Sequence, residues 1–461
     1  MPSKGTAEYW RVESTQKSLM RHFLEKVESG SARGRDGLTP VAFSRSLPKE
    51  IRHISRDLRE NKYRFSPYLL ALKLKGQGKS PREISIPTVR DRVVLRALGA
   101  ALSRSHSFCS LELPQSQIGR VINALEQDRY NYFLKVDVKD FYPTIRHEWL
   151  EAVLRKRIPS RRFRNLLMQA VRTSTLPAGA RKKLATVDRG IPQGLAVSNG
   201  LAELSVRHLD EMMQSLPGIA YFRYVDDILI FMVRDDSEKI LTAIIPELSR
   251  AGLEMHPVSE AGESKSSKGR IDSGFEFLGY RFMWPRVTVR ETSFIKLEAR
   301  IARIFTRYKY ILQQRPTEQP WRNQCLLRLE WHLNLTITGC FLEGKRYGWL
   351  SYFSQIRHHQ LLEHLDWLVT KQMRRFDVED ISPKIFVKSY RFAASRREDP
   401  TGYVPNFDSM SANEKRQLLV DIFSWGESKA ANCTDEEIEA HFLRRIRHLA
   451  IELERDISAS Y

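Results

Sequence analysis

The chain has 461 residues, 42% of them apolar and 10% aromatic, which is enough to fill the cores of about two to four packed domains. Its 75 lysine and arginine residues against 55 acidic residues give a net charge of +20, so we expect a polyanionic partner, nucleic acid before a membrane. A basic but inert surface is the alternative. The N-terminus has no apolar signal core and no run approaches the ~18 apolar residues that cross a bilayer, so a cytosolic protein is expected.

The N-terminal part is predicted to alternate helices with one hairpin. Residues 15–27 have apolar side chains at helical spacing, and segments 43–61 and 90–106 also read as helices. Residues 73–87 form two short alternating segments around a Gly/Lys turn, which predicts a hairpin with a basic tip. The cysteines show no CxxC spacing, so neither a zinc motif nor a disulfide framework is predicted for Cys109, Cys325, Cys340 and Cys433.

Two acidic clusters stand in predicted apolar strands. In YFLKVDVKDFYPTI a strand runs into Asp137, and in YFRYVDDILIF Asp226 and Asp227 lie side by side in a predicted hairpin. Converging carboxylates raise one another's pKa unless a cation neutralises them, and such oxygen ligands suit Mg²⁺ or Mn²⁺. A metal pair is therefore expected. The alternative is that both residues of the Asp-Asp pair are ordinary turn residues.

The order of the motifs resembles the palm of reverse transcriptases. That family's first acidic motif, PQG motif, YxDD box and primer-grip strand are matched by VDVKDFYPTI, GIPQGLAVSN, YVDD and FLGY. Upstream, two segments resemble motifs shared by bacterial reverse transcriptases of the retron and group II intron kind: GRDGLTP and PREISIPTVRDRVVLRAL. The resemblance covers about residues 34–353.

This resemblance implies an α+β right-hand polymerase fold with fingers, a palm whose antiparallel sheet carries YVDD, a helical thumb and a helical C-terminal extension. The expected boundaries are a helical lead-in over 1–40, fingers over 41–131, palm over 132–290 with a fingers insertion at about 146–187, thumb over 291–369 and extension over 370–461.

The resemblance also implies RNA-directed DNA synthesis from dNTPs by two-metal phosphoryl transfer, with two Mg²⁺ ions or Mn²⁺ in their place. Asp137 and Asp226 are the implied bridging ligands, and Asp227 lies nearby. The carbonyl of Val138 is implied to complete the nucleotide-side metal.

Further positions match the family's substrate contacts. Arg82 and Arg92 match the fingers arginines that grip the triphosphate, with a solvated surface arginine as the alternative for each. Gln193 is implied to face the incoming nucleotide. Lys265 matches the lysine that protonates the departing pyrophosphate, and Lys268 is close enough to compete.

Two tyrosines complete the implied site. Tyr142 takes the position where a ring abuts the ribose C2′ and excludes a 2′-hydroxyl, which implies deoxynucleotide selection; Phe141 is the alternative gate. Tyr224 is implied to support the primer end, with core packing as its alternative.

The C-terminal part is predicted to be helical and basic. Thumb aromatics are expected in helix cores rather than stacked on bases: Trp331, Tyr347, Trp349 and Tyr352. Capping boxes are predicted at Ser411 with Glu414 and at Thr434 with Glu437. The last helix has one apolar stripe, expected to pack on the chain itself rather than on a partner, formed by Ile438, Phe442, Ile446, Leu449, Leu453 and Ile457.

The version of the PQG motif, PQGLAVSN, carries Asn199 where mobile-element enzymes usually have Pro, and it looks most like stand-alone defence-associated bacterial reverse transcriptases. That resemblance implies a cognate structured noncoding RNA, an antiphage role and a homo-oligomer. Three alternatives remain open: a retron or group II intron enzyme of a mobile element, an RNA-binding scaffold on a polymerase fold, and a template-independent polymerase primed by a protein hydroxyl such as that of Tyr461.

Overall fold

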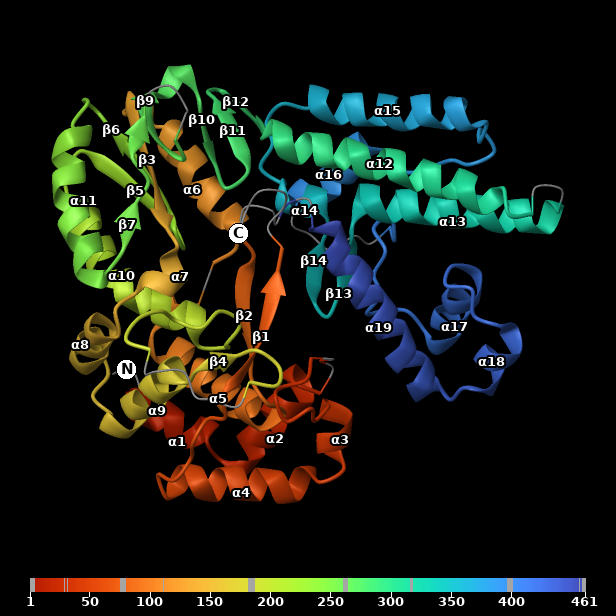
Figure 1. The fold of residues 1–461 in the computed structure, drawn as a ribbon. Helices are drawn as coiled ribbons and strands as arrows, with labels where there is room; N and C mark the ends of the chain where they lie inside the picture. The colour runs from red at the N-terminus through yellow and green to blue at the C-terminus, as the bar shows by residue number, and fades with distance from the viewer. Residues whose placement is uncertain are drawn as a thin grey trace. The chain divides into compact units, whose positions relative to one another are not determined.

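The computed structural model describes residues 5–28, 30, 32–74, 80–110, 112–180, 187–259, 264–315, 318–395, 401–455 and 457 (Figure 1). The chain forms two compact units. Unit 1 consists of Met1–Leu113 and Gln127–Arg270, and unit 2 of Pro114–Glu126 and Ile271–Tyr461. Helices combine with mainly antiparallel sheets, which confirms the predicted α+β class. The expected boundaries of fingers, palm, thumb and extension stay predictions.

The main sheet of unit 1 has six strands in the order β5-β6-β3-β9-β8, with β7 also paired to β3. Strands β5 and β6 form the hairpin predicted around YVDD, and β3 lies antiparallel to β6 and β9. One face of β3 buries Leu134, Val136 and Val138, as expected of alternating apolar residues. The strand bounds are β3 Tyr132–Lys139, β5 Ile219–Tyr224, β6 Asp227–Met232, β7 Glu254–Met255, β8 Val258–Ser259 and β9 Ser266–Arg270.

The helices that follow β3 in this part of unit 1 are α7 to α11. Helix α10 (Ser198–Ser215) is buried along most of its length and contacts β5, α8 and α11. Figure 1 shows α11 (Ser237–Ala251) beside the strands of the sheet. The α11 helix ends at Gly252, whose positive φ of 82° gives the left-handed residue that closes many helices. Helices α7 (Phe141–Thr144), α8 (His147–Arg157) and α9 (Arg161–Arg172) follow β3.

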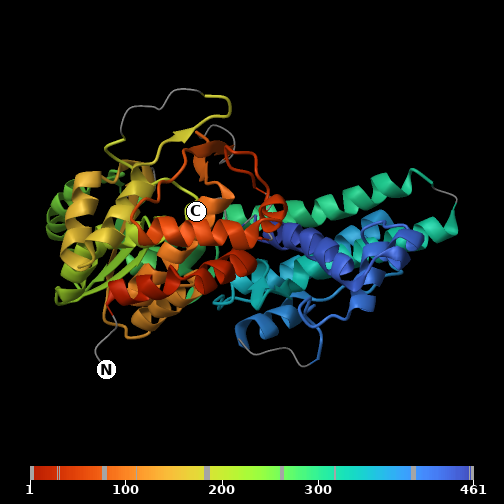
Figure 2. The ribbon, with the colours of Figure 1, turned by 90° about the horizontal axis from the view of Figure 1, so that it is seen from below.

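The N-terminal helices form a second part of unit 1, red and orange in Figure 2. The predicted helices appear with small shifts of their ends, and a short helix from Pro40 precedes the longer predicted one. Their bounds are α1 Thr6–Glu13, α2 Gln16–Lys26, α3 Pro40–Ser44, α4 Leu47–Arg59 and α5 Val89–Ser105, with the 3-10 turn η1 at Ser107–Cys109. Helices α1 and α2 both pack against α5.

The predicted hairpin is present, but its first strand begins five residues before the predicted range. Strand β1 (Tyr68–Lys73) pairs antiparallel to β2 (Arg82–Ile86), with β4 (Thr175–Leu176) on the other side of β1. The expected basic tip of this hairpin at 75–79 lies outside the described residues. Residue Asp91 anchors the entry to α5, because it accepts hydrogen bonds from the Tyr63 hydroxyl, the Ser66 amide and the Thr88 hydroxyl.

Unit 2 is mainly helical, with a three-stranded and a two-stranded antiparallel sheet. Its helices are α6 Pro114–Leu125, α12 Glu291–Leu312, α13 Gln319–Thr338, α14 Trp349–Tyr352, α15 Gln360–Phe376, α16 Phe386–Ser395, α17 Ala412–Asp421, α18 Glu427–Asn432 and α19 Asp435–Leu453, with the 3-10 turn η2 at Ile271–Ser273. Its strands are β10 Phe275–Phe277, β11 Tyr280–Met283, β12 Arg286–Val289, β13 Cys340–Leu342 and β14 Lys345–Tyr347.

The C-terminal predictions are largely confirmed. Both capping boxes are present. The α19 stripe packs on the same chain, in a core that its buried residues share with Leu335, Leu342, Phe407 and Leu419. One detail was wrong: the helix ends at Leu453, so Ile457 is buried beyond the helix, where its amide donates a hydrogen bond to the Glu454 carbonyl.

The thumb aromatics lie in or against helix cores, as predicted. Trp349 and Tyr352 are buried, while Trp331 and Tyr347 are half-buried against the core around α19. All four cysteines are free thiols. In the part of the chain that the structure describes, no helix combines the length and the apolar character that a membrane span requires.

Candidate active site

The YVDD segment forms a tight hairpin turn. Tyr224 pairs with Asp227 at the ends of β5 and β6, so Val225 and Asp226 make the two-residue connection. Val225 has a φ of 56°, a left-handed conformation that is costly for a β-branched residue. Such strain persists where surrounding contacts hold it and is typical of functional sites. Asp226 thus lies in the turn itself, while Asp227 opens strand β6.

The two acidic clusters meet at this turn. Asp137 lies directly opposite Asp227 in the β3–β6 register, and the Val138 amide donates to the Asp226 carbonyl at 3.2 Å. Burial is the main cause that raises the pKa of the Asp226 carboxyl to about 6, and the charge of Asp137 adds to it. The positive charges of Arg82 and Lys265 act in the opposite direction.

Three side chains contact Asp137. Lys265 Nζ lies 3.4 Å and His256 Nε2 lies 3.3 Å from Asp137 Oδ1, and Ser266 Oγ accepts a hydrogen bond from the Asp137 amide at 3.0 Å. The predicted competitor Lys268 instead forms an ion pair of 3.2 Å with Glu238. His256 was missed, because a single histidine after β7 carries no motif.

The pKa of His256 is lowered, first by burial and then by the charge of Lys265. At neutral pH His256 is therefore a neutral side chain beside Asp137 and supplies no counter-charge. The exposed ammonium of Lys265 then supplies the positive charge in contact with this carboxylate.

The PQG turn packs on β2. The Ser85 amide donates to the Gln193 carbonyl at 2.7 Å, and a Cβ on Gly194 would lie 2.9 Å from the Ser85 carbonyl oxygen, so only glycine fits there. Gly194 also has a φ of 105°. This contact fixes Gln193 to the strand that begins at Arg82, whose Nε is buried and has no hydrogen-bond partner in the described structure.

Tyr142 and Phe141 have different surroundings. Phe141 is 3% exposed and belongs to the core of unit 1, while Tyr142 is half-buried. Burial raises the pKa of the Tyr142 hydroxyl, and the charges of Glu203 and Asp226 add to that effect. Burial likewise raises the pKa of Tyr224. Of the two candidate gates, only Tyr142 is placed to meet a ligand.

Arg92 is engaged elsewhere. Its Nε donates to the Pro87 carbonyl at 3.2 Å and its Nη2 donates to the Ala32 carbonyl. Burial lowers its pKa. Arg92 is thus neither a solvated surface residue nor joined to the acidic cluster by any contact among the described residues.

A buried ion cluster underlies the same hairpin. Arg223, two residues before Val225, donates to Glu203 at 2.6 and 3.0 Å, to Asp210 at 2.7 Å from two of its nitrogens, and to the Val225 carbonyl at 3.0 Å. The side chains are 6%, 11% and 7% exposed for Arg223, Glu203 and Asp210. An arginine inside an apolar strand was the sequence signal, and it was not used.

The acidic residues suit a hard divalent cation. Within the described ranges there is no group of three or more histidine, cysteine or acidic side chains with metal-binding geometry. Mg²⁺, however, is usually held by one or two carboxylates together with substrate phosphates and water, not by a complete protein cage. The carboxylates of Asp137 and Asp226, which come together at one turn, match that pattern, and a cation would oppose the effects that raise the pKa of Asp226.

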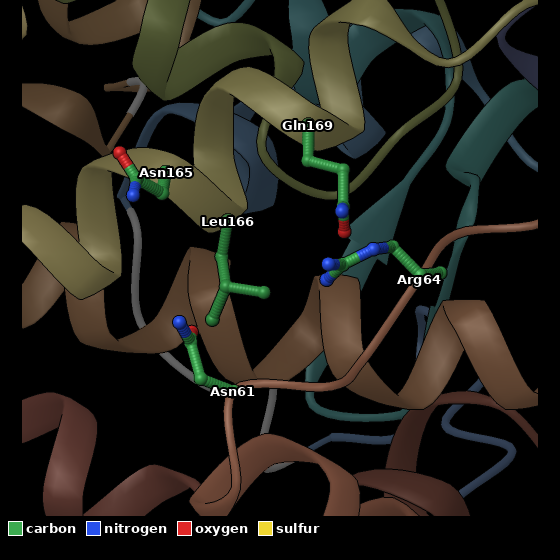
Figure 3. Close-up of a pocket in the computed structure, with 5 residues that line it drawn as sticks. All are labelled: Asn61, Arg64, Asn165, Leu166 and Gln169. Atoms are coloured by element: carbon green, nitrogen blue, oxygen red, sulfur yellow. The ribbon is translucent and has the colours of Figure 1, made fainter.

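A separate pocket of about 260 Å³ lies between the end of α4 and helix α9 (Figure 3). It is lined by Asn61, Arg64, Asn165, Leu166 and Gln169, and the side chains of Arg64 and Gln169 point toward each other. None of these residues belongs to the acidic cluster or was predicted as a site residue.

Residues 74–282 match the profile of the family described as "Reverse transcriptase (RNA-dependent DNA polymerase)". Among curated proteins, the chain is 23% identical to "Protein YkfC" of Escherichia coli over 297 residues, which are 55% of this chain and 76% of that protein. It is 26% identical to the retron Mx162 reverse transcriptase of Myxococcus xanthus over 167 residues, 32% of this chain and 34% of that enzyme.

A putative COX1/OXI3 intron 2 protein of Saccharomyces cerevisiae is 26% identical over 172 residues, 36% of this chain and 20% of that protein. The matched segments thus cover 34% of the retron enzyme and 20% of the intron protein, but 76% of YkfC. A telomerase structure from Candida albicans with a fragment of telomeric RNA matches at a TM-score of 0.40 and 10% identity, over 91% of this chain and 68% of that one. A TM-score this low does not establish a common fold, so the assignment depends on the sequence matches.

Proposed function

We propose that this chain, a reverse transcriptase (RNA-directed DNA polymerase) of the kind found in retrons and introns, makes cDNA from dNTPs at the YVDD turn of its α+β fold. The observation that carries this proposal is the β3–β6 register, which sets Asp137 opposite Asp227 and next to Asp226. Reverse transcriptases in general use divalent metal ions.

Two Mg²⁺ ions are the proposed cofactors, with Mn²⁺ as the substitute. Asp137, Asp226 and Asp227 would hold them, together with the carbonyl of Val138. When bound, the ions would stabilise the charge on the attacking and leaving oxygens. The proposal is supported by the oxygen-only donor set and by the raised pKa of Asp226.

The remaining predicted residues receive roles that fit their surroundings. Arg82 would bind the triphosphate, which its unpartnered Nε supports. Lys265, beside Asp137, would protonate pyrophosphate. Tyr142 would exclude a 2′-hydroxyl and Gln193 would face the nucleotide. Roles for Arg92 at the phosphates and Tyr224 at the primer also stay in the proposal.

The proposed biological setting is bacterial antiphage defence. A cognate structured noncoding RNA would be the template, the cDNA would be the product, and the enzyme would act in the cytoplasm as a homo-oligomer. The strongly basic chain supports a nucleic-acid partner. The antiphage role itself is supported only by the PQGLAVSN form of the PQG motif.

The experiments must also distinguish three competing functions. A mobile-element reverse transcriptase would use the same site on intron or retron RNA. A scaffold would bind RNA without synthesis. A protein-primed, template-independent polymerase would attach DNA to its own hydroxyl group; the candidate Tyr461 lies outside the described residues.

The first test is primer extension on an RNA template with dNTPs and Mg²⁺, beside the Asp226→Ala/Asp227→Ala variant. RNA-dependent product that disappears in the variant supports the proposal, and RNA binding with no aspartate-dependent DNA would support the scaffold. DNA that forms without template and shifts in a denaturing gel after protease treatment would indicate protein priming. Sequencing of RNA and cDNA bound to the chain in cells then distinguishes one cognate RNA from intron or retron transcripts.

A further inference from the structure

The hydroxyl of Tyr142 donates a hydrogen bond of 2.8 Å to Oδ1 of Asn199. Tyr142 lies in the short helix α7 that follows the Asp137 strand, and Asn199 lies in the first turn of α10, just after the PQG turn. The two residues are 57 positions apart, so the bond joins two of the motifs directly. The acceptor is the side chain that stands where mobile-element enzymes usually have Pro, which has no side-chain acceptor.

The backbone of Tyr142 is held by the same segment. Its carbonyl accepts a hydrogen bond of 2.8 Å from the Ile191 amide, and Ser198 Oγ closes the segment on itself by donating to the Pro192 carbonyl at 2.5 Å. Both ends of the Tyr142 residue, main chain and phenol, are therefore bound to residues 191–199. Phe141 adds an edge contact, with 5.5 Å between ring centroids.

The bond to Asn199 holds the hydroxyl end of the ring. Tyr142 is half-buried with its ring packed against the core of unit 1, and the charges of Glu203, Asp226 and Arg82 act on its hydroxyl. Because burial favours the protonated phenol, the hydroxyl remains a donor to Asn199 over the pH range of the enzyme. Without the amide acceptor, rotation about the side-chain bonds of Tyr142 would cost less, since a tyrosine ring is fixed by only two such bonds.

We propose that Asn199 is a positioning residue for sugar selection: by accepting the hydrogen bond from Tyr142 it holds the tyrosine ring where a ribonucleotide 2′-hydroxyl would lie. This inference depends on the proposed function, in which Tyr142 is the gate. It gives a role to Asn199, which was not among the predicted site residues and is unusual at this position of the PQG segment.

The test measures kcat/KM for one dNTP and the matching rNTP, and compares their ratio among variants. Tyr142→Phe removes only the donor and Asn199→Ala only the acceptor, so each is expected to raise the relative use of the rNTP by about threefold to tenfold, the range of one neutral hydrogen bond. The double variant should show the same change as either single one, because both remove one contact. Asn199→Asp retains an acceptor and should keep the wild-type ratio. Gln214→Ala, at the exposed end of α10, is the matched control.

A third substitution separates failure of this inference from failure of the proposed function. Tyr142→Ala should raise rNTP use more than either single variant, because it removes the whole ring. If Tyr142→Ala relaxes selection but Tyr142→Phe and Asn199→Ala do not, the hydrogen bond has no part in selection and the inference is wrong. If Tyr142→Ala leaves the ratio unchanged, the gate itself is misassigned, and if the wild-type chain incorporates neither nucleotide, the proposed activity fails. Should Asn199→Ala not fold, Tyr142→Phe against wild type decides.

Discussion

Two pairs of carboxylates lie close to the β5–β6 hairpin and are treated in opposite ways. Glu203 and Asp210 share one buried arginine, Arg223, through short hydrogen bonds. Among the described residues, Asp137 contacts an exposed lysine and a histidine, and Asp226 is affected by the charges of Arg82 and Lys265 without an ion pair of its own. Burial opposes the charge of Arg223, but the two carboxylates outweigh it and raise its pKa, whereas the pKa of Asp226 rises to about 6. The carboxylates that are ion-paired with a buried arginine stabilise the fold, and the carboxylates without such a partner are free to bind a ligand.

This contrast first predicts that activity and stability separate at the YVDD turn. If Asp226 holds a catalytic metal ion as proposed, Asp226→Asn should reduce dNTP incorporation by about a thousandfold or more, since such an ion stabilises the transition state by several kcal/mol. The same change should not lower the free energy of unfolding in metal-free urea titrations, because it removes a poorly compensated charge. A large loss of stability would mean that Asp226 stabilises the fold, as Glu203 and Asp210 do, and would contradict this prediction.

The opposite behaviour is expected of Arg223. Arg223→Met leaves Glu203 and Asp210 buried without their partner and should cost about 3–5 kcal/mol of unfolding free energy, measured by urea denaturation. The triple variant with Glu203→Gln and Asp210→Asn should recover much of that loss, because no uncompensated charge remains. A single variant as stable as the wild type would contradict the assigned role.

Lysines 265 and 268 allow a matched comparison on one strand segment. Lys265→Ala should lower kcat by about a hundredfold if this side chain transfers a proton to pyrophosphate, while Lys268→Ala should have little effect on kcat because its partner is Glu238. The measurement is single-turnover incorporation across pH. Equal losses in both variants would remove the distinction that the structure makes.

A smaller effect is expected at Glu13, another carboxylate of the paired kind, which contacts Arg21, His22 and Arg104. Burial opposes ionisation of Glu13, but the hydrogen bonds from Arg104 and His22 prevail and lower its pKa from the ordinary 4.5. A lowered carboxyl pKa stabilises the fold above about 4.5, and that contribution is lost as the pH falls through the folded-state value. The stability difference between wild type and Glu13→Gln should therefore shrink on acidification below about pH 4.5, as followed by thermal melts; a constant difference would mean that the ion pairs contribute nothing.

The sequence was sufficient to predict features that depend on residues close together in the chain. Asp137, Asp226 and Asp227 stand out because acids interrupt apolar strands, and the capping boxes follow a local spacing rule. These features need no knowledge of which distant segment lies alongside. The same holds for the last helix, whose apolar stripe predicts burial.

The contacts that sequence could not provide depend on register. Lys268 lies opposite Leu134 in the β3–β9 pair, and continuing that antiparallel register by three residues brings Lys265 level with Asp137. Only this pairing separates the two lysines. His256 reaches Asp137 because β7 pairs with Val138, and Arg92 is occupied by the carbonyl of Ala32, 60 positions away.

Helix α6 has a consequence for how this protein is made. It lies between two segments of unit 1, yet it belongs to unit 2, where Gln115 donates to the Ser351 carbonyl and Glu126 pairs with Arg357. Domains form from the N-terminus during synthesis, so α6 leaves the ribosome long before residues 271–461. Gln115 and Glu126 therefore remain without Ser351 and Arg357 until the rest of unit 2 has been made. No single cut of the chain yields the two units as separate fragments, and a fragment of residues 1–270 would retain α6 without these two partners.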